Sequence, residues 1–220
     1  MFRDALLDAL ALVLPIECAG CGAPDRSLCA GCLAALAPQP QRHELADGTT
    51  VVCALDYDGP VRAAILALKE NGRTDVARAL AVPFARAMTE ARAGVPPLEV
   101  LPVPTSRSAF RRRGYDPLAL LVRRAGVRAA TELAYARRTS QQKRLAVDER
   151  ARNRAGSLRA RRPLTGRRFL LVDDILTSGA TLDEAARAVR AQGGEIVAAA
   201  TLAYTRKRAK HPGVRSLNVS

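Results

Sequence analysis

Aromatic residues are scarce in this chain of 220 residues. It contains no tryptophan, and phenylalanine and tyrosine together make up 4% of the sequence. Leucine, valine and alanine must therefore fill the hydrophobic core, which an apolar content of 48% is large enough to form. The scarcity also limits base stacking, so a bound nucleic acid would be held mainly through its phosphates.

The chain also lacks a long apolar run. No segment reaches the about 18 consecutive apolar residues that a membrane-spanning helix needs. Residues 2–14 are rich in leucine like a signal peptide, but Asp4 and Asp8 interrupt them and no small-residue cleavage site follows. The apolar residues of this stretch instead share one helical face. We predict an N-terminal helix, no membrane span and a cytoplasmic location.

Acidic residues are few relative to basic ones. The chain has 35 Lys and Arg against 21 Asp and Glu, which gives a net charge of +14. Such an excess creates a field that attracts polyanions, and arginine binds phosphate bidentately. The composition favours a nucleic acid or a pyrophosphate-bearing substrate as a partner.

Four of the five cysteines lie in two Cys-x-x-Cys pairs separated by seven residues: Cys18, Cys21, Cys29 and Cys32. Each pair can place two thiolates on one metal ion, and neighbouring glycines supply the turns. Disulfides are the alternative, which a cytoplasmic chain disfavours. We predict a structural zinc site, because four protein ligands leave no open coordination position.

An acidic pair followed by a loop of small and hydroxyl residues is the most informative segment. The apolar residues 169–172 predict a buried strand, with Asp173 and Asp174 at its carboxyl end and a helix starting near Thr181. The loop between them consists of Leu176, Thr177, Ser178, Gly179, Ala180 and Thr181. Backbone N–H groups at a helix start favour an anion, whereas carboxylates suit sugar hydroxyls or a divalent cation. A ribose with a 5′-phosphate satisfies both halves; an ordinary strand–loop–helix turn is the alternative.

This segment resembles the signature of type I phosphoribosyltransferases. The resemblance implies that Asp173 and Asp174 hold the ribose hydroxyls of phosphoribosyl pyrophosphate, and that the 176–181 loop binds its 5′-phosphate. In a catalytic protein, these two aspartates would be the catalytic residues. Mg²⁺ and basic side chains would hold the pyrophosphate leaving group while positive charge develops on the ribose ring.

Basic residues follow the predicted strand 98–103, on the side of the sheet where an α/β site lies. We predict a loop over residues 105–110, followed by an arginine cluster over residues 111–113. We also predict that Arg107, Arg111 and Arg113 contact pyrophosphate or nucleic-acid phosphates. A solvated Arg-rich loop is the alternative. Residues 137–168 hold twelve basic and two acidic residues, which predicts a mobile basic loop.

Taken together, the segments resemble the ComF family of competence-associated proteins. The cysteine module, the Val-Pro strand end, the Arg-Gly-aromatic loop, a Gln-x-x-Leu…Arg-x-x-Asn segment and the acidic-pair loop occur in the family's order. The pattern adds Lys69, Gln142 and Arg150 to the residues predicted to bind pyrophosphate or nucleic acid. One departure is Asp116-Pro117, where the family tends to have Asn-Gln; Asp116 would place a negative charge near the pyrophosphate.

The ComF resemblance implies a cytoplasmic DNA-uptake protein that binds single-stranded DNA and works beside a helicase-like partner. The zinc module would either mediate that contact or only cap the domain. An active phosphoribosyltransferase of the nucleotide-salvage type, with an unidentified acceptor, is the alternative function.

Alternating strands and helices from residue 51 onward predict an α/β fold with a mainly parallel sheet and flanking helices. We predict three parts along the chain. They are an N-terminal helix and zinc module at 1–40, a phosphoribosyltransferase-like domain at 41–205, and a basic and polar tail at 206–220.

Overall fold

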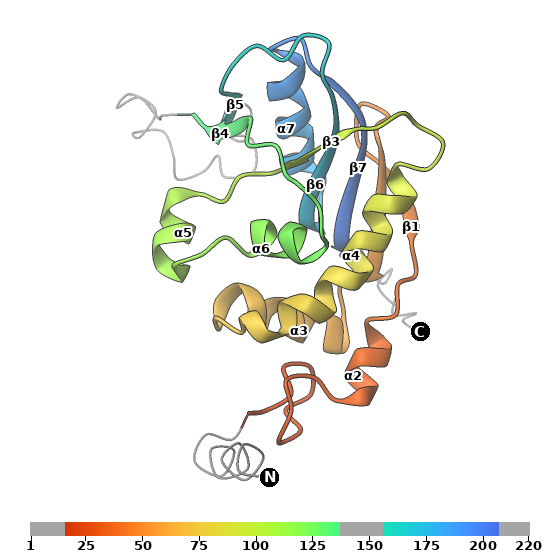
Figure 1. Ribbon diagram of the computed structural model, residues 1–220, viewed down its shortest axis with the longest axis vertical. Coiled ribbons are helices and arrows are strands. Elements are labelled where there is room, and N and C mark those ends of the chain that lie inside the picture. The colour runs from red at the N-terminus through yellow and green to blue at the C-terminus, as the bar shows by residue number, and fades with distance from the viewer. Residues whose placement is uncertain (1–15, 137–155, 207–220) are drawn as a thin grey trace, which may run out of the picture.

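A five-stranded sheet forms the centre of the computed structural model, which describes residues 16–136 and 156–206 (Figure 1). The strands lie in the order β1-β2-β7-β6-β3. Strand β1 is antiparallel to β2, and the other neighbours are parallel. The predicted mainly parallel sheet is therefore confirmed. The strand bounds are β1 Gln41–Glu44, β2 Thr50–Asp56, β3 Glu99–Pro102, β6 Arg168–Leu176 and β7 Glu195–Tyr204.

Helices cover both faces of the sheet. Helices α3 (Gly59–Glu70) and α4 (Ala77–Ala91) connect β2 to β3, with a short 3₁₀ turn between them, and α7 (Ala180–Arg190) connects β6 to β7. These two connections cross the sheet in opposite directions. Because crossovers between parallel strands are right-handed, α4 and α7 lie on opposite faces, where α4 packs on β2 and β7 and α7 packs on β6 and β7.

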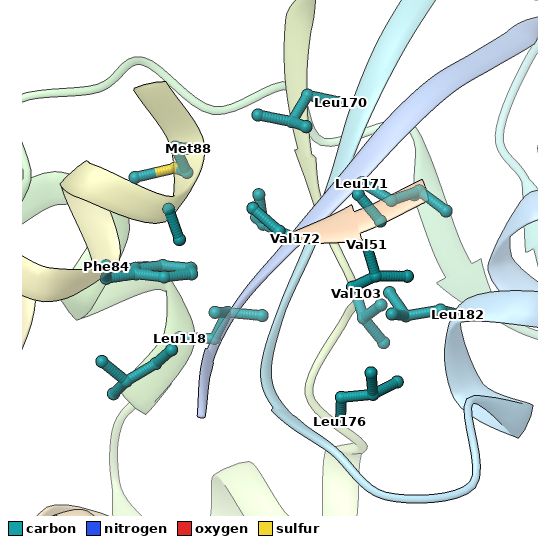
Figure 2. Packing of buried hydrophobic residues seen from close by; sticks show 14 of the residues in the cluster. Val51, Phe84, Met88, Val103, Leu118, Leu170, Leu171, Val172, Leu176 and Leu182 are labelled. Carbon is teal, nitrogen blue, oxygen red and sulfur yellow. The ribbon is translucent and has the colours of Figure 1, made fainter. Parts of the chain in front are cut away.

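The core lies between these helices and the sheet. Figure 2 shows Phe84 of α4 on one side of the β6 residues Leu170 and Val172, and Leu182 of α7 on the other. The predicted buried strand 169–172 is confirmed, because each of its four residues is 0% exposed. A strand covered on both faces reads as a continuous apolar run, which is why the sequence revealed it.

The prediction of a loop at 105–110 is wrong, because most of this segment is helical. Helix α5 (Arg107–Arg113) begins after Ser106, whose hydroxyl accepts the N–H of Ala109 at 3.2 Å, and ends at Gly114 in the left-handed conformation, φ 77°. A capping serine and a terminal glycine are ordinary helix signals. The segment was predicted to be a loop despite these signals, because its arginine content is typical of a solvated loop.

Helix α6 (Pro117–Arg124) begins at Asp116, the residue that departs from the family pattern. The Asp116 carboxylate accepts the N–H of Ala119 at 3.0 Å. This carboxylate therefore caps a helix, a role in which its negative charge interacts favourably with the N-terminal N–H groups.

The basic loop predicted over 137–168 is corrected in its described part. Strands β4 (Leu133–Tyr135) and β5 (Leu158–Ala160) pair antiparallel and pack beside α7. Further along, Arg162 and Arg167 bind the buried Glu132 carboxylate at 2.6 and 2.9 Å. Several of these basic residues therefore belong to a fixed ion-pair network.

Three predicted segments fall outside the described residues: the helix at 2–14, the first part of the basic loop at 137–155, and the tail from 207 onward. Gln142 and Arg150 lie in the second of them. Among the helices of 16–136 and 156–206, none combines the length and the apolar character needed to cross a membrane.

Candidate functional site

A cavity of about 330 Å³ opens at the carboxyl ends of β3 and β6. Five structural segments contribute polar side chains to it: the end of α3, the residues after β3, helix α5, strand β4, and the segment from β6 into α7. These polar residues are Lys69, Thr105, Ser106, Arg113, Asp173, Asp174, Thr177 and Thr181, with Tyr135 at the edge contributed by β4. The cavity is thus where ligands bind in open α/β sheets.

The acidic pair lies within β6 rather than after it, because the strand continues to Leu176. The Asp173 Oδ1 atom accepts the N–H of Asp174 at 2.8 Å. The Asp174 Oδ2 atom forms an ion pair with Lys69 Nζ at 2.9 Å, and these two side chains are 18% and 22% exposed. Partial burial strengthens this pair relative to a surface salt bridge, so Lys69 is held inside the cavity.

The loop from β6 to α7 requires a glycine at position 179. Gly179 has a φ of 83°, a conformation that other residues rarely adopt. A Cβ atom at this position would also lie 3.1 Å from Leu45 Cδ2. As the N-cap of α7, Gly179 contributes no capping side chain. The loop thus places the start of a helix next to Thr177 and Thr181, an arrangement that favours an anion, although the Ala180 N–H is directed to Ser178 Oγ at 3.5 Å.

Of the basic residues predicted at the site, Lys69 and Arg113 line the cavity. The Arg113 side chain is 14% exposed, and its Nη2 atom pairs with Glu70 at 3.0 Å. Its Nε atom is buried and has no hydrogen-bond partner among the described residues. Arg107 and Arg111 line a different hollow on another face of α5.

Sequence reasoning missed Glu70 and Tyr135. Glu70 pairs with both Arg112 and Arg113, at 3.4 and 3.0 Å, and so fixes the end of α5 against α3. Tyr135 ends β4 and is 43% exposed at the cavity. Neither residue belongs to a recognisable motif, and only the tertiary fold brings them to the site.

The four cysteines form a second candidate site. Their sulfur atoms all lie within 4.8 Å of one another, and the Cys21 and Cys29 sulfurs are 3.7 Å apart. A tetrahedral zinc ion bound at about 2.3 Å holds neighbouring sulfurs about 3.8 Å apart. The donor set and its spacing therefore fit a metal ion with four sulfur ligands.

Backbone N–H groups point at two of these sulfurs. Cys29 N–H donates to Cys18 Sγ at 3.3 Å, and Cys32 N–H donates to Cys29 Sγ at 3.4 Å. Burial alone would raise the pKa of the Cys18 thiol, but N–H groups of Cys29, Gly20 and Cys21 outweigh it and lower that pKa to about 6. Hydrogen bonds of this kind stabilise the thiolate, which is the form that binds metal.

The cysteine module packs on the start of helix α3. A Cβ atom at Gly20 would lie 2.5 Å from Cys32 Sγ and 3.3 Å from Pro60 Cβ. Arg73, beyond the end of the same helix, donates to the Glu17 carbonyl oxygen at 2.9 Å. Since α3 ends at Lys69 and Glu70, one helix joins the four-cysteine module to the cavity (Figure 1).

Residues 110–218 match the family model described as "Phosphoribosyl transferase domain". A curated relative, the DNA utilization protein YhgH of Salmonella typhi, is 27% identical over 188 residues, which cover 82% of this chain and 80% of that protein.

Solved structures of phosphoribosyltransferases are also similar. An orotate phosphoribosyltransferase from Mycobacterium tuberculosis, in complex with inorganic phosphate, is 24% identical, with 77% of this chain and 86% of that chain covered and a TM-score of 0.33. An adenine phosphoribosyltransferase from Leishmania tarentolae is 11% identical, with 75% and 94% covered and a TM-score of 0.37. Superpositions this loose add no weight of their own. By the matched domain, the curated relative and the cysteine cluster, the chain has a phosphoribosyltransferase-like domain that follows a four-cysteine module, and it is similar to proteins of the ComF family.

Proposed function

We propose that this protein acts in the cytoplasm in DNA uptake, where it binds single-stranded DNA, and that its cavity binds phosphoribosyl pyrophosphate or a 5′-phosphorylated ribose. The relative described as a DNA utilization protein supports the first part. One observation carries the second part: Asp173, Asp174, Lys69 and Arg113 line the same cavity as Thr177 and Thr181, which lie in the segment from β6 into α7.

Each half of the ligand has a matching group in the cavity. The 5′-phosphate would accept hydrogen bonds from the backbone N–H groups at the start of α7, with the hydroxyls of Thr177 and Thr181 beside it. The ribose hydroxyls would donate to the carboxylates of Asp173 and Asp174. Pyrophosphate, which has the larger charge, would lie toward Lys69 and Arg113.

Lys69 and Arg113 are paired with protein carboxylates, and this pairing sets how they would act. Lys69 binds Asp174, and Arg113 binds Glu70. An incoming pyrophosphate would compete with these carboxylates for Lys69 and Arg113. The carboxylate pair would also accept Mg²⁺, which usually binds through one or two carboxylates and substrate phosphates.

For the cysteine cluster we propose zinc, because four thiolates at tetrahedral spacing select this ion and leave no position open for a substrate. The ion would be structural and would hold the proposed 1–40 module on α3. The module is a candidate contact for the helicase-like partner, since it is rigid once metal is bound. Capping of the domain is the alternative role.

Single-stranded DNA would bind through basic surfaces. The segments 137–155 and 207–220 contain eleven basic and two acidic residues, which account for much of the net charge of +14. Contacts of this kind neutralise phosphates without reading sequence, so binding should tolerate any sequence and weaken steeply with salt.

We expect calorimetry with phosphoribosyl pyrophosphate and Mg²⁺ to show one site, with weaker binding of ribose 5-phosphate because it lacks the pyrophosphate. At a ligand concentration of about 100 times Kd, stabilisation should be about 2.7 kcal/mol, which raises the Tm by about 5–10 °C for a chain of this size. Absence of both heat and a Tm shift at millimolar ligand would contradict the proposed site.

A phosphoribosyltransferase with turnover is the second candidate, favoured by the two cations beside the acidic pair. In that reaction the ribose C1–O bond breaks, pyrophosphate leaves with the bonding electrons, and an acceptor nucleophile forms the new bond to C1. Assaying pyrophosphate release with a panel of purine and pyrimidine bases separates the candidates: acceptor-dependent release indicates an enzyme, whereas tight binding without release indicates a binding site.

A further inference from the structure

An exposed aromatic ring lies between two arginines on helix α5. Phe110 is 49% exposed, and together with Arg107 and Arg111 it lines a hollow of about 380 Å³. Thr105 and Asp116 complete the lining. Thr105 also lines the cavity at β6, so the two depressions adjoin without sharing the acidic pair.

Core packing does not explain this phenylalanine. None of the seven residues of α5 is buried, and the helix is held by polar contacts at its two ends. Ser106 caps its start, while Arg112 and Arg113 bind Glu70 at its end. The helix therefore presents the Phe110 ring to solvent instead of using it as an anchor (Figure 1 shows α5 at the edge of the molecule, beside α6).

The hollow carries positive charge that the protein does not neutralise. Within 16–136 and 156–206, neither Arg107 nor Arg111 forms an ion pair with a carboxylate, although their neighbours Arg112 and Arg113 both do. Asp116 is the acid in the lining, and its Oδ1 atom is directed to the N–H of Ala119 at the start of α6. Two guanidinium groups thus remain for an anionic partner.

Few other aromatic rings within 16–136 and 156–206 are positioned to stack on a ligand. Phe84 and Phe169 are fully buried in the core. Among the described aromatic residues, Phe110 and Tyr135 are exposed by more than two fifths, and Tyr135 lines the cavity. Phe110 is therefore the exposed ring that lies outside the cavity and beside uncommitted arginines.

We propose that this hollow is a binding surface for single-stranded DNA, with one base stacked on Phe110 and adjacent phosphates bound by Arg107 and Arg111. The inference rests on the proposed single-stranded DNA function and names one surface that contributes to it, in addition to the basic segments. Aromatic rings beside basic side chains hold unpaired bases of any sequence, because every base has a face on which to stack. In duplex DNA the base faces are covered by their neighbours, so the hollow selects the single strand. DNA and phosphoribosyl pyrophosphate should then bind at the same time.

The absence of tryptophan from the chain provides a direct test. The variant Phe110→Trp places a single tryptophan in the hollow, and we expect a thymidine oligonucleotide to quench its fluorescence on stacking. Val82→Trp is the matched control, because Val82 lies on α4 and is 63% exposed. Its emission should stay unchanged at the same oligonucleotide concentration.

Affinity measurements complete the test. Phe110→Ala should weaken binding of the oligonucleotide about 5- to 100-fold, the value of one stacked base. The pair Arg107→Gln and Arg111→Gln should reduce the slope of log K against log salt by about 1.4, whereas Arg62→Gln with Arg78→Gln should not. An unchanged Tm confirms that each variant is folded, as expected for residues outside the core.

The outcomes separate this inference from the function on which it rests. If the wild-type protein binds no oligonucleotide at moderate salt, the single-stranded DNA function itself is wrong, and the inference fails with it. If the wild-type protein binds, but Phe110→Trp is not quenched and Phe110→Ala retains full affinity, the function stands and the surface is wrong.

Discussion

Replacing Asp173 and Asp174 together by asparagine should lower the affinity for phosphoribosyl pyrophosphate on the order of 100-fold, since each hydrogen bond to a charged group contributes about 1.5–3 kcal/mol. Asparagine keeps the size of the side chain and loses the charge that attracts ribose hydroxyls and Mg²⁺. Affinity for single-stranded DNA should not fall, because neither aspartate lines the hollow at Phe110. Calorimetry and fluorescence anisotropy would measure the two affinities.

The matched control removes two negative charges elsewhere. Glu44 in β1 and Glu195 in β7 are exposed and far along the sheet from the cavity lining, so Glu44→Gln with Glu195→Gln should change neither affinity. The double asparagine variant also leaves Lys69 without its partner, so its Tm must be measured. Unchanged affinity for phosphoribosyl pyrophosphate in a folded double variant would show that the acidic pair does not hold the ribose.

The second large effect concerns a single methyl group in the cysteine module. Gly20→Ala should abolish metal binding, because the added Cβ would lie 2.5 Å from Cys32 Sγ and 2.9 Å from Cys32 Cβ. Cys32 is buried and cannot move aside without breaking the four-sulfur arrangement. The zinc content measured by elemental analysis should fall from one ion per chain in the wild-type protein to near zero in the variant. Protease should cleave the module of the variant.

Gly31→Ala is the control for that experiment. Gly31 lies within helix α2 (Ala30–Ala35), and a Cβ atom there meets nothing within 4 Å. Alanine is the better helix former by about 0.5–1 kcal/mol, so this variant should keep its zinc and become slightly more stable. Full zinc occupancy in a folded Gly20→Ala protein would contradict the tetrahedral site described for the four cysteines.

The sequence predicted those features that depend on neighbours along the chain. The apolar run 169–172 predicted a strand buried on both faces, and the spacing of the four cysteines predicted their cluster. The strand β1 was missed, because four mixed polar residues at a sheet edge carry no apolar pattern. Strands β4 and β5 were missed because each has three residues and gains its stability from packing beside α7.

For the site, the distinction between arginines was beyond the sequence. Arg107, Arg111 and Arg113 lie in one run of seven residues and were predicted to share a role. Helix α5 turns them to different faces, so Arg113 enters the cavity while Arg107 and Arg111 flank Phe110. The scarcity of aromatic residues predicted little base stacking. The structure shows that the exposure of each ring matters as well as the number of rings, because Phe110 is exposed beside two arginines.

Titration of fluorescently labelled single-stranded DNA with the zinc-loaded protein, over a salt series and with or without Mg²⁺ and phosphoribosyl pyrophosphate, tests the two-surface arrangement most directly. We predict binding whose log K falls with log salt with a slope of about −2 or steeper, which corresponds to three or more phosphate contacts. We also predict that saturating phosphoribosyl pyrophosphate leaves the DNA affinity unchanged. Displacement of the DNA by this ligand would place both at the acidic pair and contradict separate surfaces, and an absence of DNA binding at moderate salt would contradict the DNA-binding function.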